Sequence, residues 1–548
     1  MYRITLFFLL FISSSPLMLS QTKNYYLVYF SDKTNTPFSL DDPTAFLTQK
    51  SIDRRGKQGY PLTSLDLPVD PVYTDSLRLR TVEVKNTSRW FNAALIFADT
   101  TLVKDSVESL SFVDSVAILS NYGGGLNLKS ASKARTKFST ESTANTATNS
   151  SDLTQLNMLN AYYMDTLGYQ GDNMTIAVID AGFHNVDIRE GFAHLFTNNQ
   201  ILGTYDFVDH ETAVYEDHSH GTEVLSVIAG KYDEDNLGVA PNASFYLFRT
   251  EDDGSEYPIE EINWLLAVEK ADSLGVDIVS TSLGYFDFDD AFFNYTYDDL
   301  DGQTAYSSQA AHIAARTGML LVNSAGNEGR SSWRYVTVPA DVDSVLTVGA
   351  VYYNETYASF SSVGPTSDGR TKPNVAAQGV STVILSSVRD GVTTNRGTSF
   401  SCPLIAGFAA GVWQAYDTLT NIELLKLLEQ AGSRADDPNN EIGYGIPTFS
   451  RVQSIMEGTI IVDVLDIVAV NPVTDQNIML HIPLNQIGKE ITMVLFDVNG
   501  HELYRQKHSL SSSTYDTNYS LKDLDNGTYF LQVIEEDSSV LMRLLNMK

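Results

Sequence analysis

Residues 175 to 350 of this 548-residue chain alternate short apolar runs with longer segments of helical periodicity, and this alternation strongly constrains the fold. Short apolar runs between helical segments are typical of strands that are buried on both faces. We therefore predict an α/β domain in which a parallel sheet carries helices on both faces, with its cleft at the carboxyl ends of the strands. The runs are TIAVID, SFYLFRT, VDIVSTS, MLLVNSAG and VLTVGA, and the helical segments include 259–275 and 303–318.

Five polar residues stand where these elements begin or end. Asp180 ends the run TIAVID, Ser282 ends VDIVSTS and Asn327 follows MLLVNSAG. His220 opens the helical segment HGTEVLSVIAG, and Ser399 lies in GTSFSCP, where a loop turns into an apolar helix. Because strand ends and helix starts line the cleft of such a sheet, these side chains are expected to meet there.

The residue types fit acyl transfer to a serine. A serine hydroxyl is a weak nucleophile, so a histidine must take its proton and a carboxylate must hold that histidine in the correct tautomer. His220 and Asp180 fit these roles beside Ser399. The amide of Asn327 and the backbone N–H of Ser399 could donate hydrogen bonds to the oxyanion that develops on the substrate.

Each residue also has a simpler structural interpretation. An Asp at a strand end is often a turn residue, a His before Gly-Thr often caps a helix, and Asn327 could be a turn asparagine with positive φ. The catalytic interpretation is favoured because the carboxylate, the imidazole, the amide and the serine hydroxyl all occur, and in the required order along the chain.

A metal-dependent hydrolase is a second interpretation. Asp217, His218 and His220 form a DHSH cluster, but zinc or iron needs three or four ligands of matching geometry, and a helix is expected from His220 onward. We therefore predict no catalytic metal and no cofactor required for catalysis. The acidic segment Phe286–Gly302 could bind a structural calcium ion through oxygen ligands, although its spacing is not that of an EF-hand and a solvated insertion is the alternative.

The order Asp, His, Ser along the chain is that of subtilisins. With VIDAGF, HGTEV, SLG, SAGNEG and GTSFSCP, the chain resembles the subtilases over about 155–455. The resemblance implies a subtilisin-like fold and a serine endopeptidase that cleaves polypeptides through an acyl-enzyme. It also implies that Asp180, His220 and Ser399 are the catalytic triad and that Asn327 is the oxyanion donor. The residues implied to line the cleft are Ser282, Leu283, Gly284, Ala325 and Gly326.

The chain departs from the usual subtilase pattern at several positions. Glu223 stands where the family commonly has a second histidine after HGT, and Phe400 and Ser401 replace the common methionine and alanine after the nucleophile. Leu404 replaces a frequent histidine. Tyr285 follows SLG, where a small residue is common, and could narrow the cleft.

The segments before the peptidase domain (154–457) are expected to serve export and maturation. Residues 1–20 have the pattern of a secretory signal peptide. Residues 21–125 combine four short strands with a helical segment at 42–55, which predicts a small α+β domain. By position and size it resembles the prodomain of subtilases, with an accessory domain as the alternative. Residues 126–153 are rich in Ser, Thr and Ala and are expected to form a linker.

Residues 458–548 return to short strands and predict a β-sandwich. The segments NPVTD, LFDVNGHEL and LDNGTYFLQV and the terminal LLNMK resemble the C-terminal sorting domain of type IX secretion substrates in Bacteroidetes. The alternative is a carbohydrate-binding or adhesive domain. The resemblance implies that the type IX machinery is a partner and that the protein is secreted or placed on the cell surface, via the periplasm.

The net charge of −32 argues against nucleic acid as a partner. No apolar run after the signal peptide is long enough to span a membrane. The expected partners are therefore polypeptide substrates, the chain's own prodomain and the secretion machinery. The alternative function is a catalytically silent surface-binding protein on a subtilase scaffold.

Overall fold

The computed structural model describes three long stretches of the chain and much of its C-terminal part: residues 23–120, 153–232, 235–457, 468–469, 477–481, 489–498, 500–510, 514–520, 524, 527–535 and 538–546. The predicted signal peptide, 1–20, and the predicted linker, except for residue 153, lie outside the described residues.

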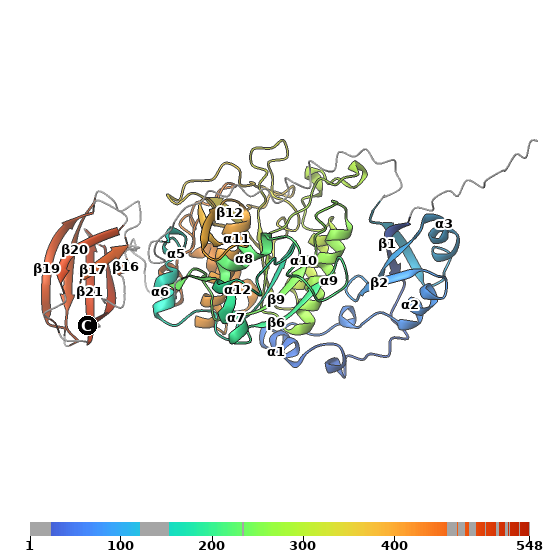
Figure 1. Ribbon diagram of the computed structural model, residues 1–548, viewed down its shortest axis with the longest axis horizontal. Coiled ribbons are helices and arrows are strands. Elements are labelled where there is room, and N and C mark those ends of the chain that lie inside the picture. Colours follow the sequence, from blue (N-terminus) through green and yellow to red (C-terminus); the bar gives the residue numbers. More distant parts are fainter. Residues whose placement is uncertain are drawn as a thin grey trace, which may run out of the picture.

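A seven-stranded parallel sheet forms the centre of the chain, with the strand order β13-β12-β11-β10-β5-β9-β6 (Figure 1). The parallel α/β prediction is confirmed, and all five predicted runs are strands. The strands β6 and β13, at the two edges, were not among the predicted runs. The bounds are β5 (Thr175–Asp180), β6 (Ile201–Asp206), β9 (Ser244–Arg249), β10 (Ile278–Thr281), β11 (Leu320–Ser324), β12 (Val345–Val351) and β13 (Val375–Gln378).

Helices cover both faces of this sheet. Side chains alternate along a strand, so Ile176 and Val178 of β5 pack on one face and Ala177 and Ile179 on the other. The first face is covered by α8 (His220–Ala229), α11 (Thr398–Ala415) and α12 (Asn421–Gln430). The second is covered by α9 (Ile259–Leu274) and α10 (Tyr306–Ala315).

The strand order reverses beside β5. Its neighbours are β9, which leads to β6, and β10, which leads to β11, β12 and β13. Ligand clefts of open parallel sheets lie at the carboxyl end of such a reversal. Asp180 ends β5 and Ser282 directly follows β10, so both stand at this point.

Smaller elements complete the central region. An antiparallel hairpin of β14 (Thr382–Leu385) and β15 (Val392–Asn395) leads directly into α11. The remaining elements here are α5 (Thr154–Asn157), α6 (Ala161–Thr166), α7 (Ala193–Thr197), α13 (Phe449–Glu457), β7 (Lys231–Tyr232), β8 (Asp235–Asn236) and 3₁₀ turns at Glu190–Phe192, Ala291–Phe293 and Tyr297–Asp299.

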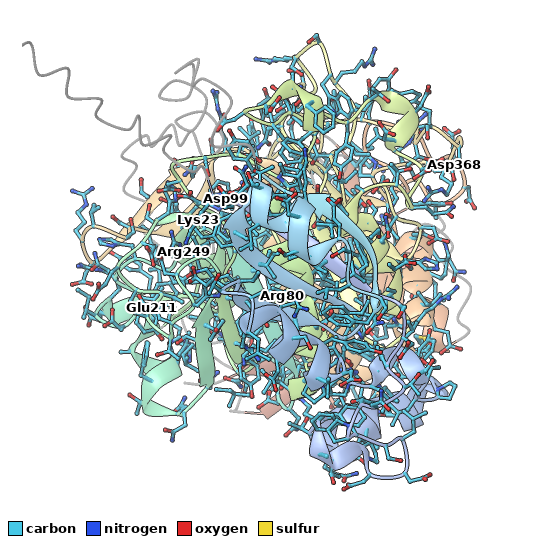
Figure 2. All side chains as sticks on the ribbon, turned by 90° about the vertical axis from the view of Figure 1, so that its right-hand side faces the viewer. Lys23, Arg80, Asp99, Glu211, Arg249 and Asp368 are labelled. Atoms are coloured by element: carbon cyan, nitrogen blue, oxygen red, sulfur yellow. The ribbon has the colours of Figure 1, made fainter. Side chains whose placement is uncertain are left out.

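The N-terminal part is an antiparallel sheet of order β2-β3-β1-β4 with helices, as predicted (Figure 2). Along β1, Val28 and Phe30 face this part's own core, whereas Leu27 faces the cluster that contains α9 and α10. The elements are β1 (Lys23–Phe30), α1 (Gln49–Gln58), α2 (Pro71–Arg78), β2 (Glu83–Ser88), β3 (Ala93–Asp99), α3 (Thr100–Leu102), a π turn (Val103–Val107), β4 (Val113–Ile118) and 3₁₀ turns at Pro43–Ala45 and Ser64–Asp66.

The predicted helix at 42–55 starts later than expected. The side chain of Thr48 accepts a hydrogen bond from the N–H of Ser51 and caps α1, so the helix runs over Gln49–Gln58.

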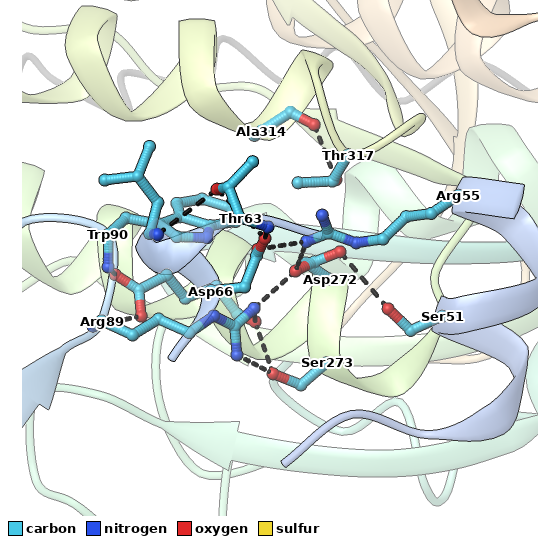
Figure 3. Close-up of polar contacts among 12 residues, drawn as sticks. Ser51, Arg55, Thr63, Asp66, Arg89, Trp90, Asp272, Ser273, Ala314 and Thr317 are labelled. Atoms are coloured by element: carbon cyan, nitrogen blue, oxygen red, sulfur yellow. Dashed lines mark hydrogen bonds and ion pairs between the residues drawn. The ribbon is translucent and has the colours of Figure 1, made fainter. Parts of the chain in front are cut away.

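A buried ion network joins the N-terminal part to α9 (Figure 3). The carboxylate of Asp272 accepts from Arg54, from Arg55 at 2.7 Å and from Arg89 at 2.5 Å, and the three arginine side chains are 4–9% exposed. The carboxylate of Glu269 accepts from the side chain of Ser88 and, at 3.0 Å, from the N–H of Arg89. Because these charges are out of water, Arg54 and Arg89 depend on Asp272 across the interface, whereas Arg55 also pairs with Asp66 at 2.8 Å within the N-terminal part.

The described C-terminal strands form two antiparallel sheets, of orders β16-β17-β20 and β19-β18-β21-β22, as expected for a β-sandwich. In Figure 1 they lie at the end of the molecule opposite the N-terminal sheet. Their bounds are β16 (Val468–Ala469), β17 (Asn477–His481), β18 (Glu490–Phe496), β19 (Glu502–Ser509), β20 (Thr514–Ser520), β21 (Gly527–Glu535) and β22 (Ser538–Asn546). Within the described residues, none of the helices is long and apolar enough to cross a membrane.

Candidate active site

Asp180 and His220 form a buried pair at the reversal of strand order. The Nδ1 atom of His220 lies 2.7 Å from Oδ1 of Asp180, and the two residues are 3% and 0% exposed. An ionised carboxylate can only accept, so Nδ1 carries the proton and Nε2 is the nitrogen able to take one. The pair has the geometry of an oriented general base.

A glycine allows this close approach. A Cβ atom at Gly221 would clash with the carbonyl oxygen of Gly182 and lie 3.0 Å from Cβ of Asp180. The start of α8 can therefore rest on the end of β5 only because residue 221 has no side chain.

Burial and nearby charges shift the pKa of His220 in opposite directions. Burial lowers the pKa of His220, whereas the charge of Asp180, its hydrogen bond and the charges of Glu223 and Glu251 raise it. The net effect raises the pKa of His220 above the ordinary value for histidine.

Ser399 is the second residue of α11 and is 8% exposed. Gly397 precedes the helix with φ 148°, a conformation that side-chain-bearing residues rarely adopt. The ring of Phe400 lies 6.1 Å from that of His220, which brings the starts of α11 and α8 together. The N–H groups of the first helical turn have no acceptor within the helix, and the helix dipole favours negative charge there.

A proline inside α11 leaves the carbonyl of Ser399 free for a partner outside the helix. Pro403 has no N–H to donate to the carbonyl four residues earlier, which is that of Ser399. The hydroxyl of Ser282 donates to this oxygen at 3.0 Å. The segment after β10 is thus tied directly to the backbone of the candidate nucleophile.

Asn327 is held by the same helix start. Its Oδ1 atom accepts from the N–H of Thr398 at 2.9 Å and from the hydroxyl of Thr398 at 3.1 Å. Since Oδ1 is the acceptor, Nδ2 is the donor end, and a Cβ atom built on Gly397 would lie 3.7 Å from it. The positive φ considered for Asn327 belongs instead to Gly326, at 101°.

The predicted cleft segments are rigidly supported. The carbonyl of Leu283 accepts from the side chain of Asn323 at 3.1 Å. The N–H of Ala325 donates to the carbonyl of Val348 at 2.9 Å, and its carbonyl accepts from the N–H of Thr337 at 3.2 Å. A Cβ atom at Gly284 would collide with Thr337. The supporting role of Asn323 was not predicted, because nothing in the sequence pattern of β11 indicates which way its side chain reaches.

Tyr285 does not narrow the cleft as suggested from the sequence. Its side chain is 1% exposed, and its hydroxyl donates to Oε1 of buried Glu251 at 2.7 Å. The aromatic ring therefore belongs to the packing beneath the cleft.

The DHSH cluster does not form a metal site in the described structure. His220 is engaged by Asp180, and Nδ1 of His218 accepts from the N–H of His220 at 3.1 Å. Nor does the acidic segment 286–302 bring three carboxylates close enough to share an ion.

One other group of carboxylates does come together among the described residues: Asp206, Asp209 and Asp217. The guanidinium of Arg249 lies 2.6, 2.8 and 3.4 Å from them, respectively. The positive charge of Arg249 occupies the position among the three carboxylates that a calcium ion would take, so these residues do not fit a calcium site.

Comparison with known families decides the assignment. A family model described as the subtilase family matches residues 171–445, half of the chain. The chain belongs to the subtilase family. It is accordingly a subtilisin-like serine-type endopeptidase. A model for the propeptide domain of S8 peptidases of Bacteroidota matches residues 25–137, and one for the secretion-system C-terminal sorting domain matches residues 471–546. This subtilase is therefore a zymogen with a type IX sorting domain.

Its relatives include subtilisins of Bacillus species. Subtilisin DY of Bacillus licheniformis is 30% identical over 282 residues, which cover 51% of this chain and 91% of the relative. Subtilisin NAT of Bacillus subtilis subsp. natto is 33% identical over 296 residues, 53% of this chain and 68% of the relative.

Solved structures that resemble this chain include that of the MycP3 protease from the type VII (ESX-3) secretion system. It is 21% identical with a TM-score of 0.45, and the match covers 57% of this subtilase and 90% of MycP3. MycP1 from Mycobacterium smegmatis is 20% identical with a TM-score of 0.44, over 57% of this subtilase and 87% of MycP1.

Proposed function

We propose that this subtilase is a secreted endopeptidase in which Ser399 is the nucleophile, His220 the general base and Asp180 the carboxylate that orients it. The observation that carries the proposal is the fully buried hydrogen bond of 2.7 Å between His220 and Asp180, beside the start of the helix that bears Ser399. If Asp180 and His220 only stabilised the fold, no serine would be needed at the start of that helix.

The reaction proceeds in two halves. His220 takes the proton of the Ser399 hydroxyl through Nε2 while the oxygen attacks the scissile carbonyl, and it then gives this proton to the leaving amine. Water, activated by the same imidazole, hydrolyses the acyl-enzyme. Asp180 stabilises the imidazolium in both halves without accepting the proton.

Two donors stabilise the oxyanion: Nδ2 of Asn327 and the N–H of Ser399. The hydrogen bonds from Thr398 to Oδ1 of Asn327 support this assignment, because they fix the orientation of the amide before substrate arrives. Preorganised donors of this kind act most strongly in a site that excludes water.

An extended polypeptide is the proposed substrate. Its backbone pairs with Ser282, Leu283 and Gly284, and Ala325 and Gly326 line the opposite side of the cleft. Pairing by backbone hydrogen bonds accepts many sequences, with selectivity coming from the side-chain pockets.

The flanking segments serve maturation and export in this proposal. Residues 21–125 form the prodomain, which binds the peptidase domain (154–457), and residues 458–548 form the sorting domain that the type IX machinery reads. A signal peptide at 1–20 takes the chain to the periplasm, from which it reaches the surface or the medium. A chain lacking 458–548 should remain in the periplasm, and its normal export would contradict the sorting role.

Casein hydrolysis by the purified, matured protein tests the catalytic proposal. Ser399→Ala should abolish hydrolysis. Ser401→Ala, two residues further along α11, is the matched control and should retain it, because Ser401 stands where alanine is common in the family. Activity that survives in Ser399→Ala but is lost on chelation would favour the metal-dependent alternative, and inactivity of the unmodified enzyme would favour a silent scaffold.

A further inference from the structure

Glu223 is a carboxylate beside the candidate base that the mechanism above does not use. It lies in the first turn of α8, three residues after His220, so the two side chains lie on the same face of the helix. It also stands at a position where the family pattern has a histidine. Its Oε2 atom accepts a hydrogen bond from Nδ2 of Asn395 at 2.8 Å.

Asn395 connects this carboxylate to the loop that precedes the nucleophile. It ends β15 and is 2% exposed. Its Oδ1 atom accepts from the N–H of Arg396 at 2.8 Å, which fixes the backbone one residue before Gly397. Both ends of the amide are thus used, one on α8 and one on the segment that leads to Ser399.

We propose that Glu223 and Asn395 form a positioning pair that sets the helix of His220 against the loop of Ser399, and that Glu223 adds a negative charge beside the base. The inference rests on the proposed peptidase function and deepens it. Asp180 orients the imidazole from β5, whereas the Glu223–Asn395 pair fixes the distance between base and nucleophile from the other side.

The charges around the base can be named element by element. β5 contributes Asp180, the loop after β9 contributes Glu251, and His218 precedes the helix. The 3₁₀ turn that packs on α8 contributes exposed Glu190. Of the other elements packed on α8, β14 has no titratable residue and α11 has only the thiol of Cys402.

Glu223 acts on the base through its charge. Burial and the charge of Asp180 raise the pKa of Glu223, whereas His220 and the hydrogen bond from Asn395 lower it, and the net shift is upward. The charge of Glu223 in turn raises the pKa of His220. Because only neutral imidazole can accept the serine proton, removing this charge should extend activity toward lower pH.

Steady-state kinetics over a range of pH on the matured enzyme separate the two roles. Glu223→Gln keeps an acceptor for Asn395 but loses the charge, so the acid limb of kcat/KM should move to lower pH while the plateau of kcat changes by less than about threefold. Asn395→Ala removes the link, and kcat should fall about 10- to 100-fold with little change in KM. Glu216→Gln, an exposed carboxylate before α8, is the control and should leave the profile unchanged.

A swapped pair distinguishes positioning from a general loss of stability. Asn395→Asp alone sets two carboxylates against each other and should lower kcat. The double variant Glu223→Gln/Asn395→Asp restores one donor and one acceptor across the same contact, and it should recover kcat to within about fivefold of the unmodified enzyme. Glu223→His, the residue common in the family, provides a second charge-removing variant that the fold should accept.

The inference is overturned if Glu223→Gln and Glu223→His keep the acid limb of the unmodified enzyme, or if Asn395→Ala keeps its kcat. It is also overturned if the swapped pair is no more active than Asn395→Asp alone. An inactive unmodified enzyme would instead overturn the proposed function on which the pair depends, so the two failures are distinguishable.

Discussion

At the scale of single residues, the site depends on the imidazole of His220, whose pKa is lowered by burial and raised by nearby carboxylates. Burial disfavours the charged form of His220, but the charge of Asp180, its hydrogen bond and the charges of Glu223 and Glu251 together outweigh burial, so the net pKa is raised. A raised pKa makes the base stronger, but it also keeps the base protonated to higher pH. The activity of the enzyme at low pH is therefore limited by this residue.

We expect kcat/KM to rise with pH and to reach half of its plateau above the ordinary pKa of histidine. The sign follows from the mechanism: protonated His220 cannot accept a proton, and its raised pKa moves the pH range of low activity upward.

Asp180→Asn should lower kcat by about 10⁴-fold, because an amide favours the wrong tautomer of the imidazole. Near-normal turnover in this variant would remove Asp180 from the triad.

Asn327→Ala should lower kcat by about 10²- to 10³-fold, the loss known for removing one such donor from a subtilisin. KM should change little, since the amide contacts the oxyanion and not the ground-state carbonyl. Initial rates with a chromogenic peptide measure both constants. A rise in KM at unchanged kcat would instead place Asn327 in ground-state binding.

At the scale of elements, the start of α11 is held by contacts that replace ordinary helical ones. Pro403 deprives the carbonyl of Ser399 of its helical donor, and Ser282 supplies a hydroxyl in its place. The loop after β10, which would bind substrate, and the nucleophile are thus parts of one hydrogen-bonded unit.

Ser282→Ala should leave this buried carbonyl without a donor and lower the free energy of unfolding by about 1–3 kcal/mol. In the double variant Ser282→Ala/Pro403→Ala, residue 403 regains an N–H and can close the helical bond to Ser399. Urea unfolding should therefore show that the double variant is more stable than the sum of the two single changes predicts. Strict additivity would contradict the proposed exchange of donors.

The elements were predictable to the extent that their patterns are local. The apolar runs identified the inner strands, because strands buried on both faces are apolar throughout, and the longer segments between those runs identified α9 and α10. The edge strand β6 (ILGTYD) is only partly buried and has a weaker pattern. The side-chain partners of Asn323, Glu223 and Asn395 come from other elements, so no local pattern could indicate them.

At the scale of the whole molecule, the N-terminal part is fastened to the peptidase core by buried charge. Burial raises the pKa of Asp272, but Arg89, Arg54 and Arg55 lower it more, so its carboxylate stays ionised with its pKa below the usual range. Three guanidinium groups from one side thus share one carboxylate from the other. Prodomain binding in this chain should depend on that carboxylate.

Asp272→Ala would leave Arg54 and Arg89 buried without their ion-pair partner, whereas Arg55 would keep Asp66 at 2.8 Å. We expect the unprocessed chain to lose about 3–5 kcal/mol of unfolding free energy. The matched control is Asp417→Ala, which breaks an exposed ion pair of 3.3 Å between Lys57 of α1 and the core. Such a pair is screened by water, so the control should be indistinguishable from the unmodified chain. Equal effects of the two changes in urea unfolding would contradict the role assigned to Asp272.

The central claim is that Asp180 and His220 activate Ser399, and labelling with a fluorophosphonate probe tests it most directly. The matured protein is treated with the probe and the modified peptide is mapped by mass spectrometry. The account predicts modification at Ser399 alone, with labelling lost in His220→Ala and retained in Ser401→Ala. Absence of labelling in matured, folded protein, or modification at another serine, would contradict it.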